Sequence, residues 1–179
     1  MGLATETTED LERQFTRLCS DHLVEGDRYC IEAALALARI AHDGQTRKHG
    51  APYLEHPLRV AISLLREFSV RQGDLICVAL LHDVLEDAGH HHVDAIEAAC
   101  GPTVRQLVEV LTAPDSSLCP TKAVQSRLKA ERVAAAPSTA WLVKLADRID
   151  NLRDACLLND SPENRLFWVR YQQETSDFY

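Results

Sequence analysis

The stretch Ala-Leu-Leu-His-Asp-Val-Leu-Glu-Asp at residues 79–87 decides how this sequence is interpreted. An apolar run ends there in a histidine and an aspartate, and two further carboxylates, Glu86 and Asp87, follow one helical turn later. Residues three and four apart share a face of a helix, so we expect His82 and Asp83 to form one polar wall with those carboxylates. Because burying polar groups without partners costs several kcal/mol, the pattern predicts a divalent metal with an acid/base pair beside it.

A metal at this position needs ligands from more than one helix, because adjacent residues point about 100° apart around a helix axis. The candidates are His56, at the start of a predicted helix, and Asp147, inside another. Two imidazoles and two carboxylates, without a thiolate, fit one octahedral ion with open water positions. Manganese is the first choice, and iron, magnesium and zinc stay open. The alternatives are a hydrogen-bonded polar core at 82–83, a helix-start role for His56, and an ion pair of Asp147 with Arg148 or Lys144.

The composition predicts one soluble domain. The chain has 179 residues, of which 46% are apolar, and its formal net charge is −8. That charge argues against a broad nucleic-acid surface, which needs clustered positive charge. No apolar run reaches the roughly 20 residues of a membrane span. Six cysteines without a C-x-x-C pair, and no signal peptide, favour a reduced cytoplasmic setting.

Apolar residues recur at helical spacing along most of the chain, and no stretch alternates as a strand does. Helices are predicted at residues 10–22, 28–42, 57–68, 74–87, 93–100, 103–111, 121–135, 139–157 and from 162 toward the end, with loops at 43–55 and 113–120. Thr7 and Asp10 are spaced as a capping box, Ser161 stands as a cap before Pro162, and Gly101-Pro102 separates the predicted helices at 93–100 and 103–111. We expect an all-α, single-domain helical bundle over residues 1–179, with a short helix ahead of a core at about 28–179.

Four stretches in order resemble the metal-dependent HD phosphohydrolases, and more narrowly the hydrolase domain of RelA/SpoT-type enzymes. They are His-Asp-Gly-Gln-Thr-Arg-Lys at 42–48, Pro-Tyr-Leu-Glu-His-Pro at 52–57, the opening stretch, and Val-Lys-Leu-Ala-Asp-Arg-Ile-Asp-Asn-Leu-Arg at 143–153. An isolated His-Asp pair is weak evidence, whereas the four stretches together are specific. The resemblance implies an HD-type bundle and the activity of stand-alone small alarmone hydrolases. These enzymes remove the 3′-pyrophosphate from ppGpp and pppGpp and leave GDP or GTP.

The resemblance also implies a role for ten residues. It makes His56, His82, Asp83 and Asp147 the ligands of one Mn²⁺, Glu86 and Asp87 the pair that activates and orients water, and Arg47, Lys48, Asn151 and Tyr171 the substrate contacts. The Arg-Lys pair lies in a Gly/Pro-rich loop, where arginine can bind phosphate in bidentate fashion and lysine acts as a point charge. The alternatives are a solvated helix end for the acids, a solvated loop for the Arg-Lys pair, and packing or capping for Asn151 and Tyr171.

Two features depart from the resemblance. Asp150 stands where relatives often carry histidine or tyrosine, and a carboxylate there is expected to repel the phosphates or alter the nucleoside pocket. The three histidines at 90–92 are expected to form a solvated loop rather than the catalytic metal site. The expected partner is a small nucleotide, with no nucleic acid or membrane, and the oligomeric state is open. The competing functions are HD-type hydrolysis of another nucleotide and non-catalytic nucleotide binding, and the paired acids argue against the latter.

Overall fold

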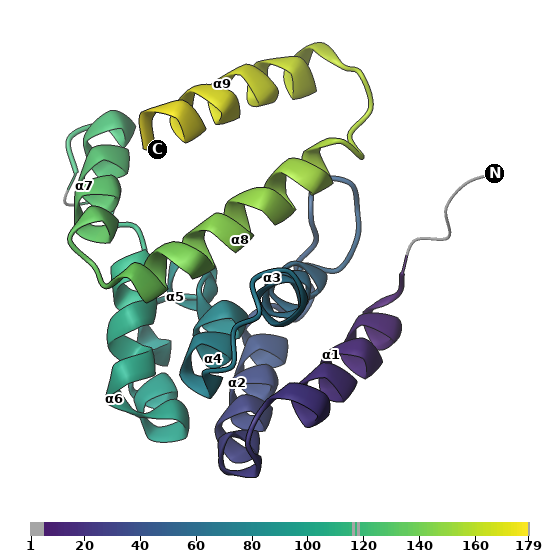
Figure 1. Ribbon diagram of the computed structural model, residues 1–179. Helices are drawn as coiled ribbons and strands as arrows, with labels where there is room; N and C mark the ends of the chain where they lie inside the picture. Colours follow the sequence, from purple (N-terminus) through teal and green to yellow (C-terminus); the bar gives the residue numbers. More distant parts are fainter. Residues whose placement is uncertain (1–5, 116, 118, 179) are drawn as a thin grey trace.

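The computed structural model describes residues 6–115, 117 and 119–178, and these residues form helices joined by loops (Figure 1). The helices are α1 (Thr8–His22), α2 (Arg28–Ala41), α3 (Glu55–Arg66), α4 (Gly73–Leu81), α5 (Val84–Asp87), α6 (Val93–Leu111), α7 (Lys122–Ala134), α8 (Ser138–Ala155) and α9 (Pro162–Phe178), with 3₁₀ turns η1 (Glu25–Asp27) and η2 (His90–His92). Over the described ranges, β-pairing is limited to an isolated bridge between Thr46 and Pro52. The predicted all-α fold is confirmed. Among those same residues, no helix combines the length and apolar character needed to cross a lipid bilayer.

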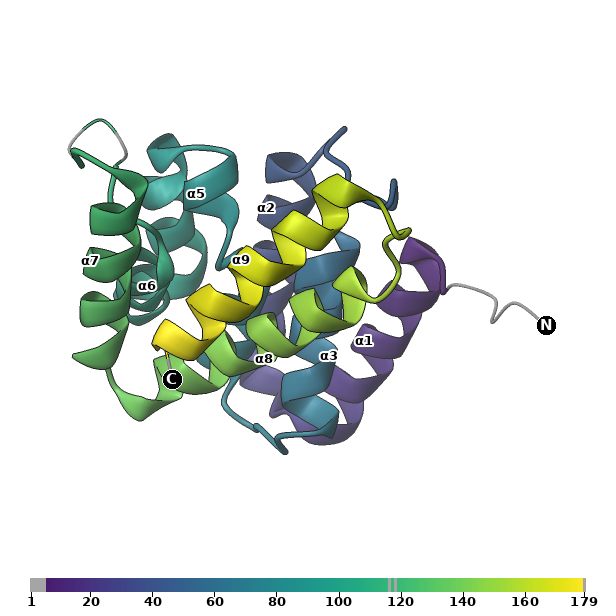
Figure 2. The same ribbon diagram turned by 90° about the horizontal axis from the view of Figure 1, so that it is seen from above.

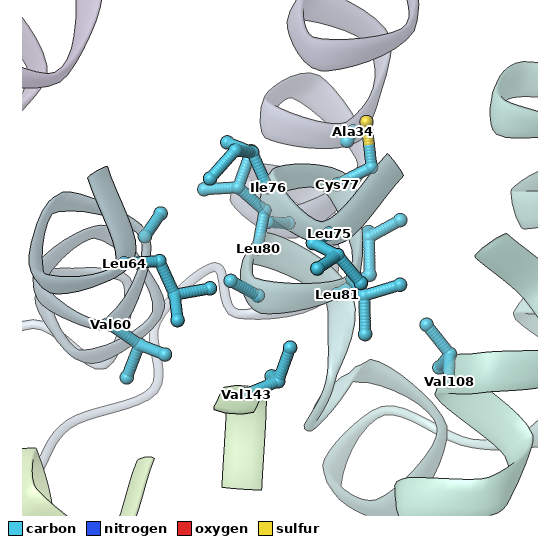
Figure 3. Packing of buried hydrophobic residues seen from close by; sticks show 14 of the residues in the cluster. Ala34, Val60, Leu64, Leu75, Ile76, Cys77, Leu80, Leu81, Val108 and Val143 are labelled. Carbon is cyan, nitrogen blue, oxygen red and sulfur yellow. The ribbon is translucent and has the colours of Figure 1, made fainter. Parts of the chain in front are cut away.

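Helix α4 lies at the centre of the hydrophobic core (Figure 3). All of its side chains except that of Asp74 are buried, as expected for a helix that is apolar on every face. The side chains around it come from four helices: Ala34 of α2, Val60 and Leu64 of α3, Val108 of α6 and Val143 of α8. Because the chain leaves α4 inside this core, the residues that follow it also start from the interior of the molecule.

The prediction of one helix over residues 74–87 is wrong. Helix α4 ends at Leu81 and α5 begins at Val84, so His82 and Asp83 occupy a turn between them. Nδ1 of His82 lies 2.8 Å from the backbone oxygen of Ala79. In a continuous helix, that oxygen would accept from the backbone N–H of Asp83. The imidazole therefore competes with the helix for this acceptor, and the polar side chains do not share a single helical face.

Local signals at other helix ends are confirmed. At the start of α1, the backbone N–H of Asp10 donates to Oγ1 of Thr7 at 3.2 Å, and that of Thr7 donates to the Asp10 carboxylate at 3.1 Å. Before α9, Oγ of Ser161 accepts from the backbone N–H of Asn164 at 3.2 Å. Gly101 has φ 84° and ψ 171° and kinks α6 at the predicted interruption. These ends depend on nearby residues, which explains why the sequence predicts them.

Helices α8 and α9 run in opposite directions across one side of the molecule (Figures 1 and 2). Helix α8 packs on α3 and α4, whereas α9 contributes no side chain to the buried core among the described residues. The loop between α2 and α3 reaches α9, since Nζ of Lys48 lies 3.3 Å from the centroid of the Phe167 ring. The loop, α8 and α9 therefore surround a common space, and the residues that line it are described next.

Candidate active site

The four predicted metal ligands lie together although they come from three parts of the chain. His56 is the second residue of α3, His82 and Asp83 follow α4, and Asp147 lies in α8. One ligand atom from each of the first three residues lies within 4.8 Å of the others. Oδ1 of Asp147 lies 3.3 Å from Nε2 of His56 and 3.7 Å from Nε2 of His82. The packing of α3 and α8 around the turn after α4 thus places four ligand groups within reach of one small cation.

Two buried nitrogen atoms test whether a cation fits this cluster. Nε2 of His56 and Nε2 of His82 are buried and have no hydrogen-bond partner among the described residues. Each faces carboxylate oxygens of Asp83 and Asp147 at 3.3 to 3.7 Å. Buried polar atoms without a partner are uncommon in folded proteins and call for an ion or a water molecule. Imidazole nitrogens facing carboxylate oxygens are ordinary ligands of divalent metals, so the residues present fit such an ion.

The carboxylates of the cluster are held in their ionised form. Nζ of Lys144 donates to Oδ2 of Asp147 at 2.5 Å, and Nδ2 of Asn151 donates to Oδ1 at 2.5 Å. Burial opposes ionisation, but Lys144 and the two histidines hold the pKa of Asp147 well below its usual range. Burial likewise opposes ionisation of Asp83, whose pKa the two histidines lower. The hydroxyl of Tyr53 also donates to Oδ2 of Asp83 at 2.8 Å. The ion pair of Asp147 with Lys144, considered above as an alternative to metal binding, is present. Asp147 nevertheless also faces both histidines.

Glu86 and Asp87 lie at the rim of the cluster, on the short helix α5. Both residues are exposed, and both line a polar cavity of about 200 Å³ together with Asp83 and Asp147. Oε2 of Glu86 accepts from Nζ of Lys129 on α7 at 2.6 Å. Desolvation of the carboxyl group and the negative charge of Asp83 raise the pKa of Asp87. The pair is thus adjacent to the buried ligand groups and open to solvent on its other side.

A second cavity, of about 310 Å³, adjoins the polar one. The two cavities share four lining residues: Arg47, Tyr53, Asn151 and Tyr171. The second cavity also contains aliphatic and aromatic side chains, among them Leu158 and Phe167. Its volume is in the range of pockets that hold small organic ligands. A ligand can therefore extend from an aromatic cavity into one lined by carboxylates and cations.

The predicted basic pair lies at the boundary of these cavities. Nε of Arg47 donates to Oδ2 of Asp154 at 2.7 Å, and Nη2 donates to Oδ1 of Asn151 at 2.5 Å. The guanidinium carbon lies 5.2 Å from the centroid of the Tyr53 ring. Lys48 is exposed and lies over the Phe167 ring. Arg47 is therefore fixed by protein contacts, whereas Lys48 joins the loop to α9.

The two other predicted substrate contacts also line both cavities. Asn151 donates to Asp147 and accepts from Arg47, so it connects the ligand cluster to the loop. The ring of Tyr171 stacks with that of Phe167 at a centroid distance of 5.6 Å. Capping and packing interactions are thus present at both residues, and both side chains also border the space available to a ligand.

Three cations in the polar cavity were not assigned from the sequence: Lys129, Lys144 and Arg148. Arg148 is 8% exposed, and its Nε and Nη1 atoms have no hydrogen-bond partner in the described part of the chain. Its guanidinium carbon lies 4.3 Å from the centroid of the Tyr171 ring. Lys144 and Arg148 lie within about one helical turn of Asp147, so helical spacing could have identified them. Lys129 lies outside the matched stretches, and only the tertiary structure brings it to the site.

The structure does not support the expectation that the carboxylate of Asp150 repels the phosphates or alters the nucleoside pocket. Asp150 lines neither of the two cavities and is 3% exposed. Its Oδ2 atom lies 2.7 Å from Nδ1 of His56, on the side of the ring away from the predicted metal. Nε of Arg59 donates to Oδ1 at 2.8 Å, and Nη2 donates to Oδ2 at 3.0 Å. Because Asp150 is nearly one turn after Asp147, it lies on the same side of α8 but contacts a different part of α3.

The histidine tract at His90–His92 forms the short turn η2, and its first two residues are exposed. The centroids of the His91 and His92 rings lie 4.2 Å apart. Among the described residues, this tract belongs to no group of three or more potential metal ligands. The expectation of a solvated segment agrees with this placement.

Comparisons with known proteins agree with the fold. Residues 34–179 match the profile of the HD domain. Human "Guanosine-3′,5′-bis(diphosphate) 3′-pyrophosphohydrolase MESH1" is 40% identical over 126 residues, which cover 69% of this chain and 68% of that protein. The "Bifunctional (p)ppGpp synthase/hydrolase SpoT" of Escherichia coli K12 is 32% identical over 172 residues, which cover 94% of this chain and 23% of that protein.

A solved structure shows the same similarity in three dimensions. It is described by the words "A metazoan ortholog of SpoT hydrolyzes ppGpp and plays a role in starvation responses". The two chains share a TM-score of 0.70 and 31% sequence identity, over 83% of this chain and 84% of that one. The residues matched by the HD-domain profile include the His82-Asp83 turn, His56, the Glu86-Asp87 pair and Asp147. This chain therefore belongs to the HD-domain family.

Proposed function

We propose that this protein is a divalent-metal-dependent hydrolase of ppGpp and pppGpp, which releases pyrophosphate from the 3′ position and leaves GDP or GTP. The observation that carries the proposal is the junction of the two cavities, where Arg47, Tyr53, Asn151 and Tyr171 line both. A polar cavity beside the ligand cluster suits a diphosphate, and the aromatic cavity suits a base. The names of the human and E. coli relatives support a guanosine bis(diphosphate) as the substrate. Residues 1–179 are proposed to act as one hydrolase domain in the cytoplasm.

The proposed cofactor is one Mn²⁺ held by His56, His82, Asp83 and Asp147. Membership of the HD-domain family implies dependence on a divalent metal, and a nitrogen and oxygen ligand set without thiolate favours Mn²⁺. Such an ion, when bound, lowers the pKa of a water ligand and neutralises charge on phosphoryl oxygens. The Tyr53 hydroxyl restrains the carboxylate of Asp83, which limits the orientations of one ligand.

The chain's own acids are proposed to handle the protons of the reaction. Attack of water on the phosphorus attached to the 3′ oxygen forms a new O–P bond and breaks the P–O3′ bond. Glu86 accepts the proton that the water loses, and Asp87 orients the water by hydrogen bonding. The 3′ oxygen then takes up a proton from solvent, and pyrophosphate leaves. Both carboxyl groups border the cavity that also contains Asp83 and Asp147, which supports a role for them beside the reacting phosphate.

Four cations border the polar cavity proposed to hold the phosphates: Arg47, Lys129, Lys144 and Arg148. Arg148 is the best suited to a phosphate oxygen, because two of its nitrogen atoms are buried without a hydrogen-bond partner among the described residues. Guanidinium groups bind phosphate through parallel hydrogen bonds. These charges offset the acidic background of a chain with a formal net charge of −8. The Phe167 and Tyr171 rings would hold the base at the other end of the ligand.

The direct test is incubation of purified, Mn²⁺-loaded protein with ppGpp while pyrophosphate and GDP are measured. A panel of pppGpp, GTP, GDP and ATP, each with and without Mn²⁺, defines the substrate class. Release of pyrophosphate only from nucleotides with a 3′-diphosphate is the expected result. Turnover of other nucleotides but not of ppGpp would replace the substrate and leave an HD-type hydrolase. Calorimetric binding of ppGpp without any product would instead identify a nucleotide-binding module.

A further inference from the structure

The imidazole of His56 is restrained at both nitrogen atoms. Its ring is fully buried, with Nε2 facing the carboxylates of Asp147 and Asp83 and Nδ1 lying 2.7 Å from Oδ2 of Asp150. An ionised carboxylate can only accept hydrogen bonds. Nδ1 must therefore carry a hydrogen and donate it to Asp150. In a neutral ring, this arrangement leaves the lone pair on Nε2, the nitrogen that faces the ligand cluster.

His82 obtains the equivalent restraint from its own helix, and His56 does not. Nδ1 of His82 donates to the backbone oxygen of Ala79, three residues earlier. His56 lies at the start of α3, where few helical carbonyl groups precede it, and its restraint comes from the side chain of Asp150 on α8. The two histidines thus direct the same nitrogen toward the cluster by different means. One contact is local in the sequence, and the other depends on the packing of α3 against α8.

Asp150 is itself held by a forked contact with Arg59. Nε and Nη2 of Arg59 donate to the two oxygens of Asp150 at 2.8 and 3.0 Å, a geometry that prevents rotation of the carboxylate. Nη2 of Arg59 also donates to Oδ1 of Asp154 at 2.7 Å, and the other oxygen of Asp154 accepts from Arg47. The guanidinium group of Arg59 therefore holds both Asp150, which contacts His56, and Asp154, which contacts Arg47.

We propose that Asp150 and Arg59 are a positioning pair, which fixes the orientation and tautomer of His56 so that Nε2 presents its lone pair to a divalent cation. This inference rests on the metal centre of the proposed function and does not depend on which nucleotide is hydrolysed. Neither residue lines the two cavities proposed to hold the substrate; both border a separate cavity of about 1160 Å³, so their proposed effect on the metal runs through His56. Carboxylates that orient a metal-binding histidine typically contribute about 10- to 100-fold to metal affinity.

Asp150→Asn is the informative substitution because it keeps the shape of the side chain. Its amide can rotate to donate to Nδ1, which would move the ring hydrogen to Nε2 and block the lone pair. Calorimetry with Mn²⁺ should show a Kd about 10- to 100-fold higher than that of the unsubstituted protein. Arg59→Gln should raise the Kd in the same direction but by less, since Asp150 remains in place.

Glu67→Gln is the matched control. Glu67 accepts from Nη1 and Nη2 of Arg153 at 2.9 Å each, and this pair joins the end of α3 to α8 on the surface. It shares the chemistry of the Asp150–Arg59 contact but not the contact with His56. The Mn²⁺ Kd of this variant should equal that of the unsubstituted protein. If the Mn²⁺ Kd of Glu67→Gln rose as much as that of Asp150→Asn, the inference would be overturned. Any loosening of the contact between α3 and α8 would then be enough to weaken metal binding.

A spectroscopic readout separates positioning from a purely structural role. The visible absorption of Co²⁺-loaded protein reports the ligands and geometry around the ion, and it should change in Asp150→Asn and not in Glu67→Gln. At saturating Mn²⁺, the KM for ppGpp should be unchanged in Asp150→Asn, because the residue does not touch the substrate. Unchanged Mn²⁺ affinity and an unchanged Co²⁺ spectrum in Asp150→Asn would overturn the inference, even if the melting temperature fell.

Three further outcomes complete the test and keep the inference distinct from the proposed function. If Asp150→Asn does not fold, Arg59→Gln decides the question, since an unchanged Kd in that variant would overturn the pairing. A second outcome is that the variants lose Mn²⁺ affinity as expected while the unsubstituted protein fails to hydrolyse ppGpp. That result would support the positioning pair and overturn only the proposed substrate. Failure of the unsubstituted protein to bind Mn²⁺ would overturn the metal centre and this inference together.

Discussion

Oε2 of Glu86 lies 2.6 Å from Nζ of Lys129, so the carboxylate proposed to accept a proton is tied to a lysine on another helix. The backbone N–H of Ala113 donates to the same oxygen at 3.2 Å. Glu86 is exposed, but these two contacts hold its carboxylate at the wall of the polar cavity. The same contact brings the positive charge of Lys129 to the place where substrate phosphates are proposed to lie.

Replacing Glu86 should separate catalysis from metal binding. In Glu86→Gln the side chain keeps its size but no longer takes a proton, so kcat should fall by about 10²- to 10⁴-fold. The Kd for Mn²⁺ should not change, because Glu86 is not among the proposed ligands. Pyrophosphate release and calorimetry measure the two quantities on the same preparation. A variant with normal turnover would remove Glu86 from the mechanism.

Lys129 should contribute to substrate binding more than to the chemical step. Lys129→Met should raise KM for ppGpp about 10- to 100-fold, since hydrogen bonds to charged groups contribute about 1.5–3 kcal/mol. Arg127→Met is the control, because Arg127 lies on the same helix but pairs with Glu131 on the surface. Steady-state kinetics at saturating Mn²⁺ distinguish the two variants. Equal effects would mean that general surface charge, and not the position of Lys129, governs binding.

Asp83 should be needed for metal and activity together. Asp83→Ala removes a carboxylate that faces Nε2 of both His56 and His82, so bound Mn²⁺ and ppGpp hydrolysis should both be lost. Treatment of the unsubstituted protein with a chelator should have the same effect, and added Mn²⁺ should restore its activity. Metal content measured after gel filtration, beside turnover, checks the prediction. Full activity in Asp83→Ala would show that the ligand assignment is wrong.

Phe167 should hold the base of the substrate. Phe167 lines the aromatic cavity, so Phe167→Ala should raise KM about tenfold with a smaller effect on kcat, as base stacking contributes about 1–3 kcal/mol. The neighbouring Leu166 is 52% exposed and is absent from the cavity lining, which makes Leu166→Ala a matched control. Kinetics with ppGpp measure both variants. A larger loss for Leu166→Ala would place the base elsewhere.

Gly101 should be required for stability and not for catalysis. Its φ of 84° and ψ of 171° lie in a region that only glycine occupies readily, so Gly101→Ala should lower the free energy of unfolding by about 1–3 kcal/mol. Apart from its chain neighbours and the nearby backbone of its own helix, no atom of the described residues lies within 4 Å of where a Cβ would stand, so the loss comes from backbone strain. Gly26 has equal space without a positive φ, and Gly26→Ala should not destabilise the protein by that mechanism. Chemical denaturation followed by circular dichroism compares the two variants.

The fold was largely predictable because helix periodicity and capping depend on nearby residues. The Thr7–Asp10 capping box and the kink at Gly101 are both present where the sequence predicts them. The prediction of one helix over residues 74–87 was wrong because helix propensity takes no account of side chains that compete for backbone hydrogen bonds. The ring of His82 takes the backbone oxygen of Ala79, and the helix ends there. Competition between a side chain and the backbone is decided by the site, not by the pattern of apolar residues.

The candidate site was predictable to the extent that its residues lie in recognisable stretches. The four metal-ligand assignments and the roles of Glu86 and Asp87 came from those stretches and stay predictions, although the structure brings all six residues together. Lys129 could not be found in this way, because it joins the site through the packing of α7. Asp150 was visible in the sequence, but the direction of its side chain was not.

The sequence by itself determined the helical class, most helix ends and the residue types that can bind a metal, because each depends on local spacing. Only the tertiary structure decided what those residues face. It placed Asp150 behind His56 and joined it to Arg59, although the expected position was beside the phosphates. The physical reason is that helical spacing determines which side of α8 a residue occupies, whereas the partner on that side is determined by how α3 packs against α8.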